Sequence, residues 1–289
     1  MTSLGDQLRG KRVGVVLSAG YFGFYGHAGF VDGLLSRGVR PAAWAGTSAG
    51  GMIAAFTAAG VPPARTIELL LQRKRDDFWD PSWLELARGA LARTSRTTGL
   101  LAGERFRALL DDFLPVRTFD AVGAPLVLVA TSLTTQAPLV LREGDLPSAI
   151  HATCAYPGLF QAVRRGEHLL WDGGIVDKAP ALALWDACPG QLDSLVVHFL
   201  PSRDGAREPN GPFAYASGMA SGFAAVRKDH FRLQLELLRA RGVEVHVVTS
   251  RLPPVSPKEM HRGVDAVNAG RASALRALDE PSAGWTGED

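Results

Sequence analysis

A Gly-x-Ser-x-Gly motif, Gly46-Thr47-Ser48-Ala49-Gly50, lies between an apolar run at 41–45 and a helix-forming run at 51–59. This context is typical of a nucleophile elbow, in which a sharp strand-to-helix turn exposes the serine hydroxyl. Glycine is needed on both sides because the strand and the helix pass so close that a Cβ would clash. An ordinary turn is the alternative, since a chain with 32 glycines contains such motifs by chance. The flanks favour Ser48 as a nucleophile at the positive end of a helix.

The apolar run 13–17 leads into a second glycine-bearing stretch that extends to Gly29. A turn of this kind between a strand and a helix presents backbone N–H groups, which are suitable donors for an oxyanion. Its aromatic side chains are compatible with an acyl pocket or with core packing at the start of a helix; they are Tyr21, Phe22, Phe24 and Tyr25.

A third segment places an acid at the end of an apolar strand. Leu169-Leu170-Trp171 is followed by Asp172-Gly173-Gly174, which predicts one carboxylate fixed at a strand tip. A turn acid that caps the following segment is the alternative for Asp172. Asp177 is interpreted as a loop acid or a cap rather than as a second base.

In order and spacing, these segments resemble the patatin-like phospholipases over about residues 12–180. That family has a Gly-rich oxyanion turn after the first strand, then Gly-x-Ser-x-Gly, then Asp-Gly-Gly or Asp-Gly-Ala. The resemblance implies a Ser–Asp dyad, with Ser48 as nucleophile and Asp172 as its base, and no histidine in the relay. It also implies that Gly46, Gly50, Gly173 and Gly174 are the motif glycines.

The activity implied by the resemblance is that of a serine acyl-ester hydrolase. Such an enzyme would cleave fatty-acyl esters of phospholipid, lysophospholipid or neutral lipid through an acyl-Ser48 intermediate. Burial of Asp172 would raise its pKa toward the working range and make it a stronger base. The partner implied is a lipid substrate, with no cofactor.

The oxyanion turn departs from the family pattern. Where the family usually reads Gly-Gly-Gly-x-Arg-Gly, this chain reads Ala19-Gly20-Tyr21-Phe22-Gly23-Phe24, so Gly23 replaces the usual arginine. Backbone donors survive any substitution except proline, so an oxyanion hole formed by Gly20, Tyr21 and Phe22 is expected if their dihedral angles suit non-glycine residues. Three alternatives stay open: a remodelled loop, a slow enzyme, or an enzyme with an unusual substrate.

Two further functions compete with the dyad enzyme. One is a catalytically impaired relative that binds lipid or protein because the altered turn has abolished turnover. The other is an ordinary α/β-hydrolase with a Ser–His–acid triad, for which only His261 lies in a suitable late loop.

Composition favours one globular domain over residues 1–289, with 46% hydrophobic and 21% charged residues and no marked boundary. The net charge of +2 is too small to suggest nucleic-acid binding. Cys154 and Cys188 form neither a metal set nor a disulfide framework, and the seven histidines show no paired spacing. No metal site is therefore expected.

Neither a signal peptide nor a transmembrane segment is expected. The apolar run 13–17 is shorter than a signal peptide's core, and no stretch reaches the roughly 18 apolar residues that span a bilayer. We therefore expect a cytoplasmic protein with at most peripheral membrane contact. The segment 77–103 combines Trp79 and Trp83 with arginines, which suits a lipid-facing surface or a cap helix packed on the sheet.

Alternating strand and helix patterns predict an α/β fold, a three-layer α/β/α sandwich with a mostly parallel central sheet and a site beyond the carboxyl ends of its strands. The expected strands are 13–17, 41–46, 126–130, 138–141, 195–200 and 243–248. The expected helices are 27–37, 49–59, 64–76, 104–113, 222–241 and 263–278.

Overall fold

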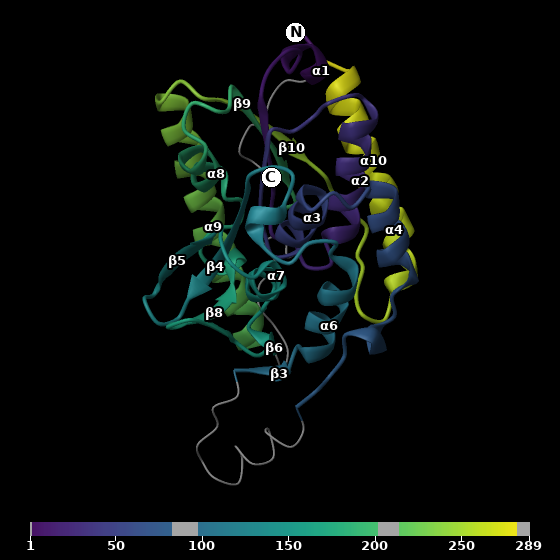
Figure 1. Cartoon of the computed structure of the whole chain (residues 1–289), viewed down its shortest axis with the longest axis vertical. Coiled ribbons are helices and arrows are strands. Elements are labelled where there is room, and N and C mark those ends of the chain that lie inside the picture. Colours follow the sequence, from purple (N-terminus) through teal and green to yellow (C-terminus); the bar gives the residue numbers. More distant parts are fainter. Residues whose placement is uncertain (1, 83–97, 202–213, 282–289) are drawn as a thin grey trace.

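A computed structural model describes residues 2–82, 98–201 and 214–281, and eight strands of this part of the chain form one sheet (Figure 1). Five of them run parallel in the order β10-β9-β1-β2-β4; they are β1 (Val13–Leu17), β2 (Ala43–Thr47), β4 (Leu126–Ser132), β9 (Ser194–Phe199) and β10 (Glu244–Thr249). Beyond β4 the direction reverses: β5 (Ala137–Leu141) and β8 (His168–Asp172) pair antiparallel with β4, and β7 (Val163–Arg165) pairs antiparallel with β8. A separate small sheet joins β3 (Gly99–Leu101) to β6 (Gly158–Phe160).

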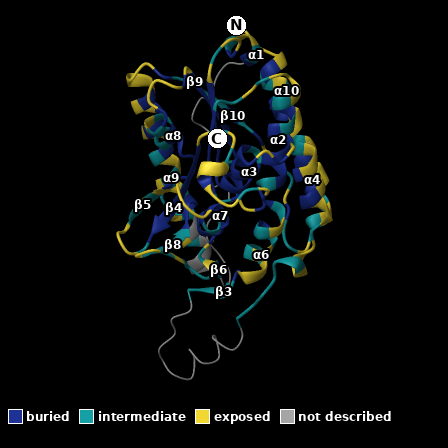
Figure 2. Cartoon of the chain, in the orientation of Figure 1, coloured by how far each residue is buried: buried dark blue, intermediate teal, exposed yellow. Residues whose placement is uncertain are grey.

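Helices cover both faces of the sheet, which makes the three layers visible in Figure 1. One layer contains α8 (Ala181–Ala187) and α9 (Ala214–Ala240). The other layer contains α1 (Leu4–Gln7), α2 (Phe24–Ser36), α3 (Ala49–Ala58), α4 (Pro63–Gln72), α6 (Glu104–Phe113), α7 (Leu146–Thr153) and α10 (Gly263–Asp279). The central strands are buried on both faces, as expected for parallel strands between helical layers (Figure 2).

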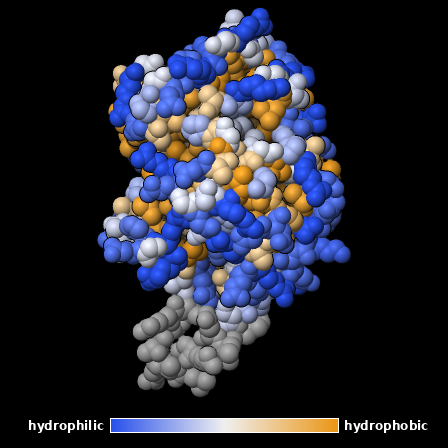
Figure 3. All heavy atoms as spheres, in the orientation of Figure 1, coloured by the Kyte–Doolittle hydropathy of each residue, from blue (hydrophilic) through white to orange (hydrophobic). Residues whose placement is uncertain are grey.

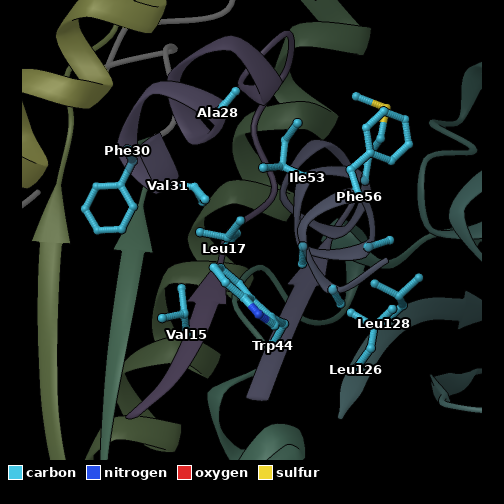
Figure 4. Packing of buried hydrophobic residues seen from close by; sticks show 14 of the residues in the cluster. Val15, Leu17, Ala28, Phe30, Val31, Trp44, Ile53, Phe56, Leu126 and Leu128 are labelled. Atoms are coloured by element: carbon cyan, nitrogen blue, oxygen red, sulfur yellow. The ribbon is translucent and has the colours of Figure 1, made fainter. Parts of the chain in front are cut away.

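Strand alternation divides the hydrophobic core into two parts. Val15 and Leu17 of β1 belong to the cluster shared with α2 and α3, where Figure 4 shows Leu17 close to Trp44 and Ile53. Val16, between them in sequence, belongs to the cluster shared with α8 and α9. Successive side chains of a strand point to opposite faces, so a continuous apolar run feeds both layers. The runs in β1, β2, β4 and β9 are therefore mostly apolar rather than alternating.

The contact between α2 and α10 is close because glycines lie at the crossing. A Cβ built on Gly29 would lie 1.9 Å from the carbonyl oxygen of Val267, and one on Gly270 would lie 1.9 Å from the carbonyl oxygen of Gly26. No side chain fits at either distance. These two glycines let the backbones of α2 and α10 touch, so α10 packs directly on α2.

The predicted three-layer fold is confirmed, with differences in detail. Helix α2 begins at Phe24 rather than at 27, so the aromatic residues that follow Gly23 belong to its first turn. Helix α9 begins at residue 214, earlier than predicted, and α4 ends at Gln72, earlier than predicted. Helices α7 and α8 and the short strands β3, β6 and β7 were not predicted.

No helix in the described ranges combines the length and the apolar character that crossing a membrane requires. On the face shown in Figure 3, hydrophobic residues form patches among hydrophilic ones rather than a continuous belt.

Candidate active site

Ser48 lies in the sharp turn between β2 and α3. Its backbone has φ 56° and ψ −127°, in the left-handed half of the map where side chains other than glycine are rare. Thr153 at the end of α7 accepts a hydrogen bond from the Ser48 backbone N–H at 3.0 Å, and the Ser48 carbonyl oxygen accepts from the Met52 N–H at 3.0 Å. The half-buried serine is thus held as the N-cap of α3, with its hydroxyl at the positive end of the helix.

Asp172 lies at the end of the antiparallel strand β8, close to the turn that contains Ser48. In β4, Val129 pairs with Thr47 of β2, and the next residue, Ala130, pairs with Asp172 of β8. The end of β8 therefore meets the end of β2 across β4, although the two strands run in opposite directions. Asp172 is 2% exposed, and its carboxylate accepts a hydrogen bond from the Gly174 N–H at 2.7 Å.

The four motif glycines lie where a side chain would collide with backbone or with the carboxylate. A Cβ on Gly46 would be 2.6 Å from the Gly50 carbonyl carbon, and a Cβ on Gly50 would be 2.3 Å from the Leu17 carbonyl oxygen. A Cβ on Gly173 would lie 2.0 Å from the Val129 carbonyl oxygen. On Gly174 it would approach Asp172 Oδ1 to 2.9 Å. The close approach inferred from the motif is confirmed for Gly46 and Gly50.

The structure brings the Ser48 and Asp172 side chains together. Burial raises the pKa of Asp172 to about 6, because a charged carboxylate loses hydration in this position. Three smaller influences lower it: the hydrogen bond from the Ser48 hydroxyl, the hydrogen bond from Gly174, and the charge of Arg227. A carboxylate with a pKa near 6 is a better base than one in water and is still mostly ionised at neutral pH.

The oxyanion turn after β1 has one residue in an unusual conformation. Phe22 has φ 53°, whereas neither Gly20 nor Tyr21 has a positive φ. The Phe22 ring is 8% exposed and packs against the rings of Phe24 and Phe78. In the register given above, Tyr21 stands where the family has glycine and Phe22 stands at its variable position, so the positive φ does not fall at a family glycine position.

A large cavity opens beside Ser48 and Asp172. Its volume is about 1210 Å³, and its wall is largely apolar, with side chains from α2, α3, α4 and α6 among those that line it. Gly20, Tyr21 and Phe22 also lie in the wall, so the structure gathers every predicted site residue except the packing glycines 46, 50 and 173 around one space. Such a cavity can hold a long apolar chain with its reactive end at Ser48.

Two cationic side chains near Asp172 were not identified from the sequence. Arg227 of α9 donates a hydrogen bond from Nη1 to the Gly174 carbonyl oxygen at 3.0 Å. Lys178 is 5% exposed, and its Nζ lies 4.3 Å from the centre of the Phe199 ring. Burial, together with the smaller effects of the charges of Arg227 and Lys228, lowers the pKa of Lys178 to about 7. Both side chains line the cavity.

Two buried histidines beneath the oxyanion turn, His27 and His198, form a chain of hydrogen bonds in which every donor and acceptor can be assigned. His27 Nε2 donates to the Ser18 carbonyl oxygen at 2.8 Å, because a carbonyl can only accept. His27 Nδ1 must then accept from His198 Nδ1 at 2.8 Å, and His198 Nε2 accepts from the Ser250 hydroxyl at 2.8 Å. Burial lowers the pKa of His27 to about 3 and also lowers the pKa of His198 well below its usual value, so both rings are neutral. Both histidines are core residues.

His261 and the segment 77–103 take other positions. His261 is exposed on the short helix η4 (Met260–Arg262) and does not line the cavity, whereas Ser48 and Asp172 both line it. Phe78 lines the cavity, and Trp79 packs against the cluster of Leu101, Ala155 and Phe160. Trp83 and the arginines of this segment lie outside the described residues.

Comparison with known proteins adds three findings. The family model described as patatin-like phospholipase matches residues 15–185. An uncharacterized NTE family protein of Mycobacterium tuberculosis is 27% identical over 208 residues, covering 70% of this chain and 33% of the relative. An uncharacterized NTE family protein of Mycobacterium bovis is 29% identical over 171 residues, covering 58% of this chain and 44% of the relative. The chain thus spans about a third to under half of the length of these relatives.

The crystal structure of VipD from Legionella pneumophila is similar in fold. It matches with a TM-score of 0.50 and 15% identity, covering 93% of this chain and 67% of that chain. At this identity the likeness concerns the fold alone. The family model, by contrast, spans β1, the Ser48 turn and the Asp172 turn, and it matches more than half of the chain. The chain therefore belongs to the patatin-like phospholipase family.

Proposed function

We propose that this chain is a serine acyl-ester hydrolase that cleaves fatty-acyl esters of lipids with a Ser48–Asp172 dyad. The observation that supports this most is that Ser48 and the buried carboxylate of Asp172, whose pKa Ser48 lowers, lie together at the wall of a large apolar cavity. Family membership supports lipid as the substrate class. We further propose that residues 1–289 act as one domain, since residues from Leu4 to Leu278 pack in a single core cluster.

In the proposed reaction, Ser48 Oγ attacks the ester carbonyl carbon while Asp172 accepts the hydroxyl proton. The tetrahedral intermediate collapses by breaking the bond to the alcohol oxygen, and Asp172 returns its proton to that leaving oxygen. This leaves an acyl-Ser48 ester. Water then attacks the acyl carbon as Asp172 takes its proton, and collapse of the second intermediate releases the fatty acid and restores the serine.

Backbone N–H groups of Gly20, Tyr21 and Phe22 would stabilise the negative charge on the carbonyl oxygen in each tetrahedral intermediate. Within the described residues, the Gly20 and Phe22 N–H groups have no protein hydrogen-bond acceptor. The positive end of α3 adds a further favourable field at Ser48. The missing family arginine is not needed for this role, because each donor belongs to the backbone.

The test is a short p-nitrophenyl ester and a fluorophosphonate probe, each applied to the wild type, Ser48→Ala and Asp172→Asn. We expect Ser48→Ala to lose labelling and at least about 10³-fold in rate, with Asp172→Asn nearly as damaging. His261→Ala serves as the control and should change the rate by less than about tenfold. Retention of activity in Ser48→Ala within tenfold would contradict the dyad. A folded wild type that neither hydrolyses nor labels would instead support the catalytically impaired binding relative.

A further inference from the structure

His27 contacts the backbone on both sides of the candidate oxyanion donors. Its Nε2 donates to the Ser18 carbonyl oxygen at 2.8 Å, and its backbone N–H donates to the Gly23 carbonyl oxygen at 2.9 Å. Between these two contacts, the Gly23 N–H donates to the Gly20 carbonyl oxygen at 2.8 Å. The segment that contains the three candidate donors is therefore closed by hydrogen bonds to one residue of α2.

The peptide unit between Ser18 and Ala19 is held at both of its polar groups. His27 binds its carbonyl oxygen, and its N–H donates to the Lys178 carbonyl oxygen at 2.7 Å. The fully buried Ser18 side chain also accepts a hydrogen bond from the Leu200 N–H at 2.9 Å. This peptide unit cannot rotate without breaking one of these bonds. The direction in which the oxyanion turn leaves β1 thus depends on the imidazole of His27.

The His27 ring is itself fixed by its neighbours. His198 Nδ1 donates to His27 Nδ1 at 2.8 Å, and the Ser250 hydroxyl donates to His198 Nε2 at 2.8 Å. The Phe30 ring stacks on His198, with ring centres 3.9 Å apart and planes 7° apart. Because the Ser18 carbonyl oxygen can only accept, one tautomer of each ring satisfies the whole series. The proton that His27 donates is therefore specified by contacts that extend to Ser250 in the cavity wall.

The oxyanion turn needs support of this kind. Phe22 has φ 53°, which a residue other than glycine keeps only when its surroundings hold it there. Oxyanion donors act through their fixed orientation, and a displacement of about 1 Å can cost about 100-fold in rate. We propose that His27 is the positioning residue of the oxyanion turn and holds its backbone donors toward Ser48. His198 and Ser250 support His27 by fixing its ring. The inference rests on the proposed function and adds to it residues that act through the turn.

An alkyl trifluoromethyl ketone tests the proposal, because its adduct with Ser48 contains the oxyanion. Ser48 Oγ bonds to the carbonyl carbon, the hydroxyl proton passes to Asp172, and the carbonyl electron pair stays on the oxygen as the negative charge. The corresponding trifluoromethyl alcohol fills the cavity without that charge. We expect His27→Leu to raise the dissociation constant of the ketone by about 10- to 100-fold and that of the alcohol by less than about twofold. On a soluble ester, kcat should fall while KM stays nearly unchanged.

Two further variants show whether the donated hydrogen bond is what matters. His27→Gln has a side-chain amide that can still donate to the Ser18 carbonyl oxygen, so it should recover part of the ketone affinity. His246→Leu is the matched control, because His246 is a half-buried histidine of β10 that lies against Glu244 and does not line the cavity. It should leave the affinity for both ligands unchanged.

Ser250→Ala keeps the proposal testable should His27→Leu not fold. It leaves His198 Nε2 without its donor and should weaken ketone binding by about three- to tenfold. A structural role alone predicts that His27→Leu lowers the melting temperature and weakens the ketone and the alcohol equally, which would overturn the proposal. Unchanged ketone affinity in folded His27→Leu, or in Ser250→Ala if His27→Leu does not fold, would overturn it as well.

Amide hydrogen exchange separates this inference from the proposed function, because it needs no reaction at Ser48. The Ala19 and Gly23 N–H groups are hydrogen-bonded, and His27→Leu should speed their exchange by about tenfold or more, whereas His246→Leu should not. A wild type that forms no ketone adduct would contradict the proposed function, and faster exchange in His27→Leu would still support His27 as the residue that positions the turn. Unchanged exchange would overturn that role, whatever the wild type does to esters.

Discussion

Asp172 is well placed to act as the base, but burial disfavours its charged form. Its pKa of about 6 reflects burial that outweighs the hydrogen bonds and the nearby arginine. Only the ionised form accepts the serine proton, so we expect kcat/KM on a soluble ester to fall about tenfold per pH unit below pH 6. The measurement is a pH–rate profile from pH 4 to 8. The variant Asp177→Asn, which changes a different buried acid, should leave the limb in place; a limb that disappears with it would assign the base to Asp177.

The same pKa makes a prediction about stability. The folded-state pKa of Asp172 lies above its unfolded value of 3.8, so this residue stabilises the fold least above pH 6, where the folded protein must hold a buried charge. Asp172→Asn removes that charge. We expect the free energy of unfolding of the variant, relative to wild type, to rise by about 3 kcal/mol between pH 4 and pH 8. Urea unfolding at both pH values measures the difference, and an unchanged difference would contradict the raised pKa.

At position 22 we expect glycine to give a more stable protein than alanine, which is the reverse of the usual order. Its ring is buried, so removing it destabilises the fold in either variant, but its φ of 53° favours glycine over any residue with a Cβ. We expect Phe22→Gly to be more stable than Phe22→Ala by about 1 kcal/mol. Tyr21→Gly, at a half-exposed position with negative φ, should be tolerated. Thermal unfolding of the three variants tests the order, and a Phe22→Ala protein more stable than Phe22→Gly would show that the turn relaxes.

At the scale of elements, the crossing of α2 and α10 depends on the absence of two side chains. Gly270→Ala would place a methyl group 1.9 Å from the Gly26 carbonyl oxygen, so the helices must separate. We expect a loss of about 2–4 kcal/mol in the free energy of unfolding. Gly222 of α9 is the matched control, since nothing lies within 4 Å of its Cβ position. Gly222→Ala should stabilise the protein by up to about 1 kcal/mol.

Trp79 distinguishes a packed segment from a lipid-facing one. Its side chain is half-buried against the Leu101 cluster, and the Arg75 guanidinium lies 5.5 Å from its ring. We expect Trp79→Ser to lower the melting temperature and to reduce activity equally on a soluble ester and on aggregated lipid, with a stability loss of about 1–3 kcal/mol. Loss on aggregated lipid alone, at an unchanged melting temperature, would favour the interfacial role instead.

The elements that could be predicted from sequence are those whose pattern is set locally. The apolar runs of β1, β2 and β9 marked strands to within about two residues, because strands buried on both faces need apolar residues throughout. Strand β7 was missed, since its three residues include Arg164 and Arg165 and it forms only by pairing with β8. Helix α7 was missed because it is short and buried on nearly all sides, with the polar residues His151 and Thr153 among the buried ones, so its sequence lacks a clear apolar stripe.

The residues of the candidate site also divide into those that a local motif predicts and those that it does not. Ser48 and Asp172 could be predicted because each lies in a motif whose glycines the local geometry requires. Thr153, which holds the Ser48 N–H, and Arg227, which reaches Gly174 from α9, gave no such signal. Their roles depend on which way a helix faces after the chain has returned to the sheet, and a single sequence does not fix that.

The whole molecule depends on pairing between distant parts of the chain. Strand β1 lies between β2, which follows it closely, and β9, whose first residue, Ser194, pairs with Val13. At about 5–20 residues per second, synthesis of the intervening segment leaves one edge of β1 without its neighbour for roughly 10 to 40 s. An unpaired apolar edge is a template for wrong pairing. The nascent chain should therefore depend on chaperones until β9 emerges, and ribosome-bound chains that end before Ser194 should be far more sensitive to protease than chains that extend beyond Thr249.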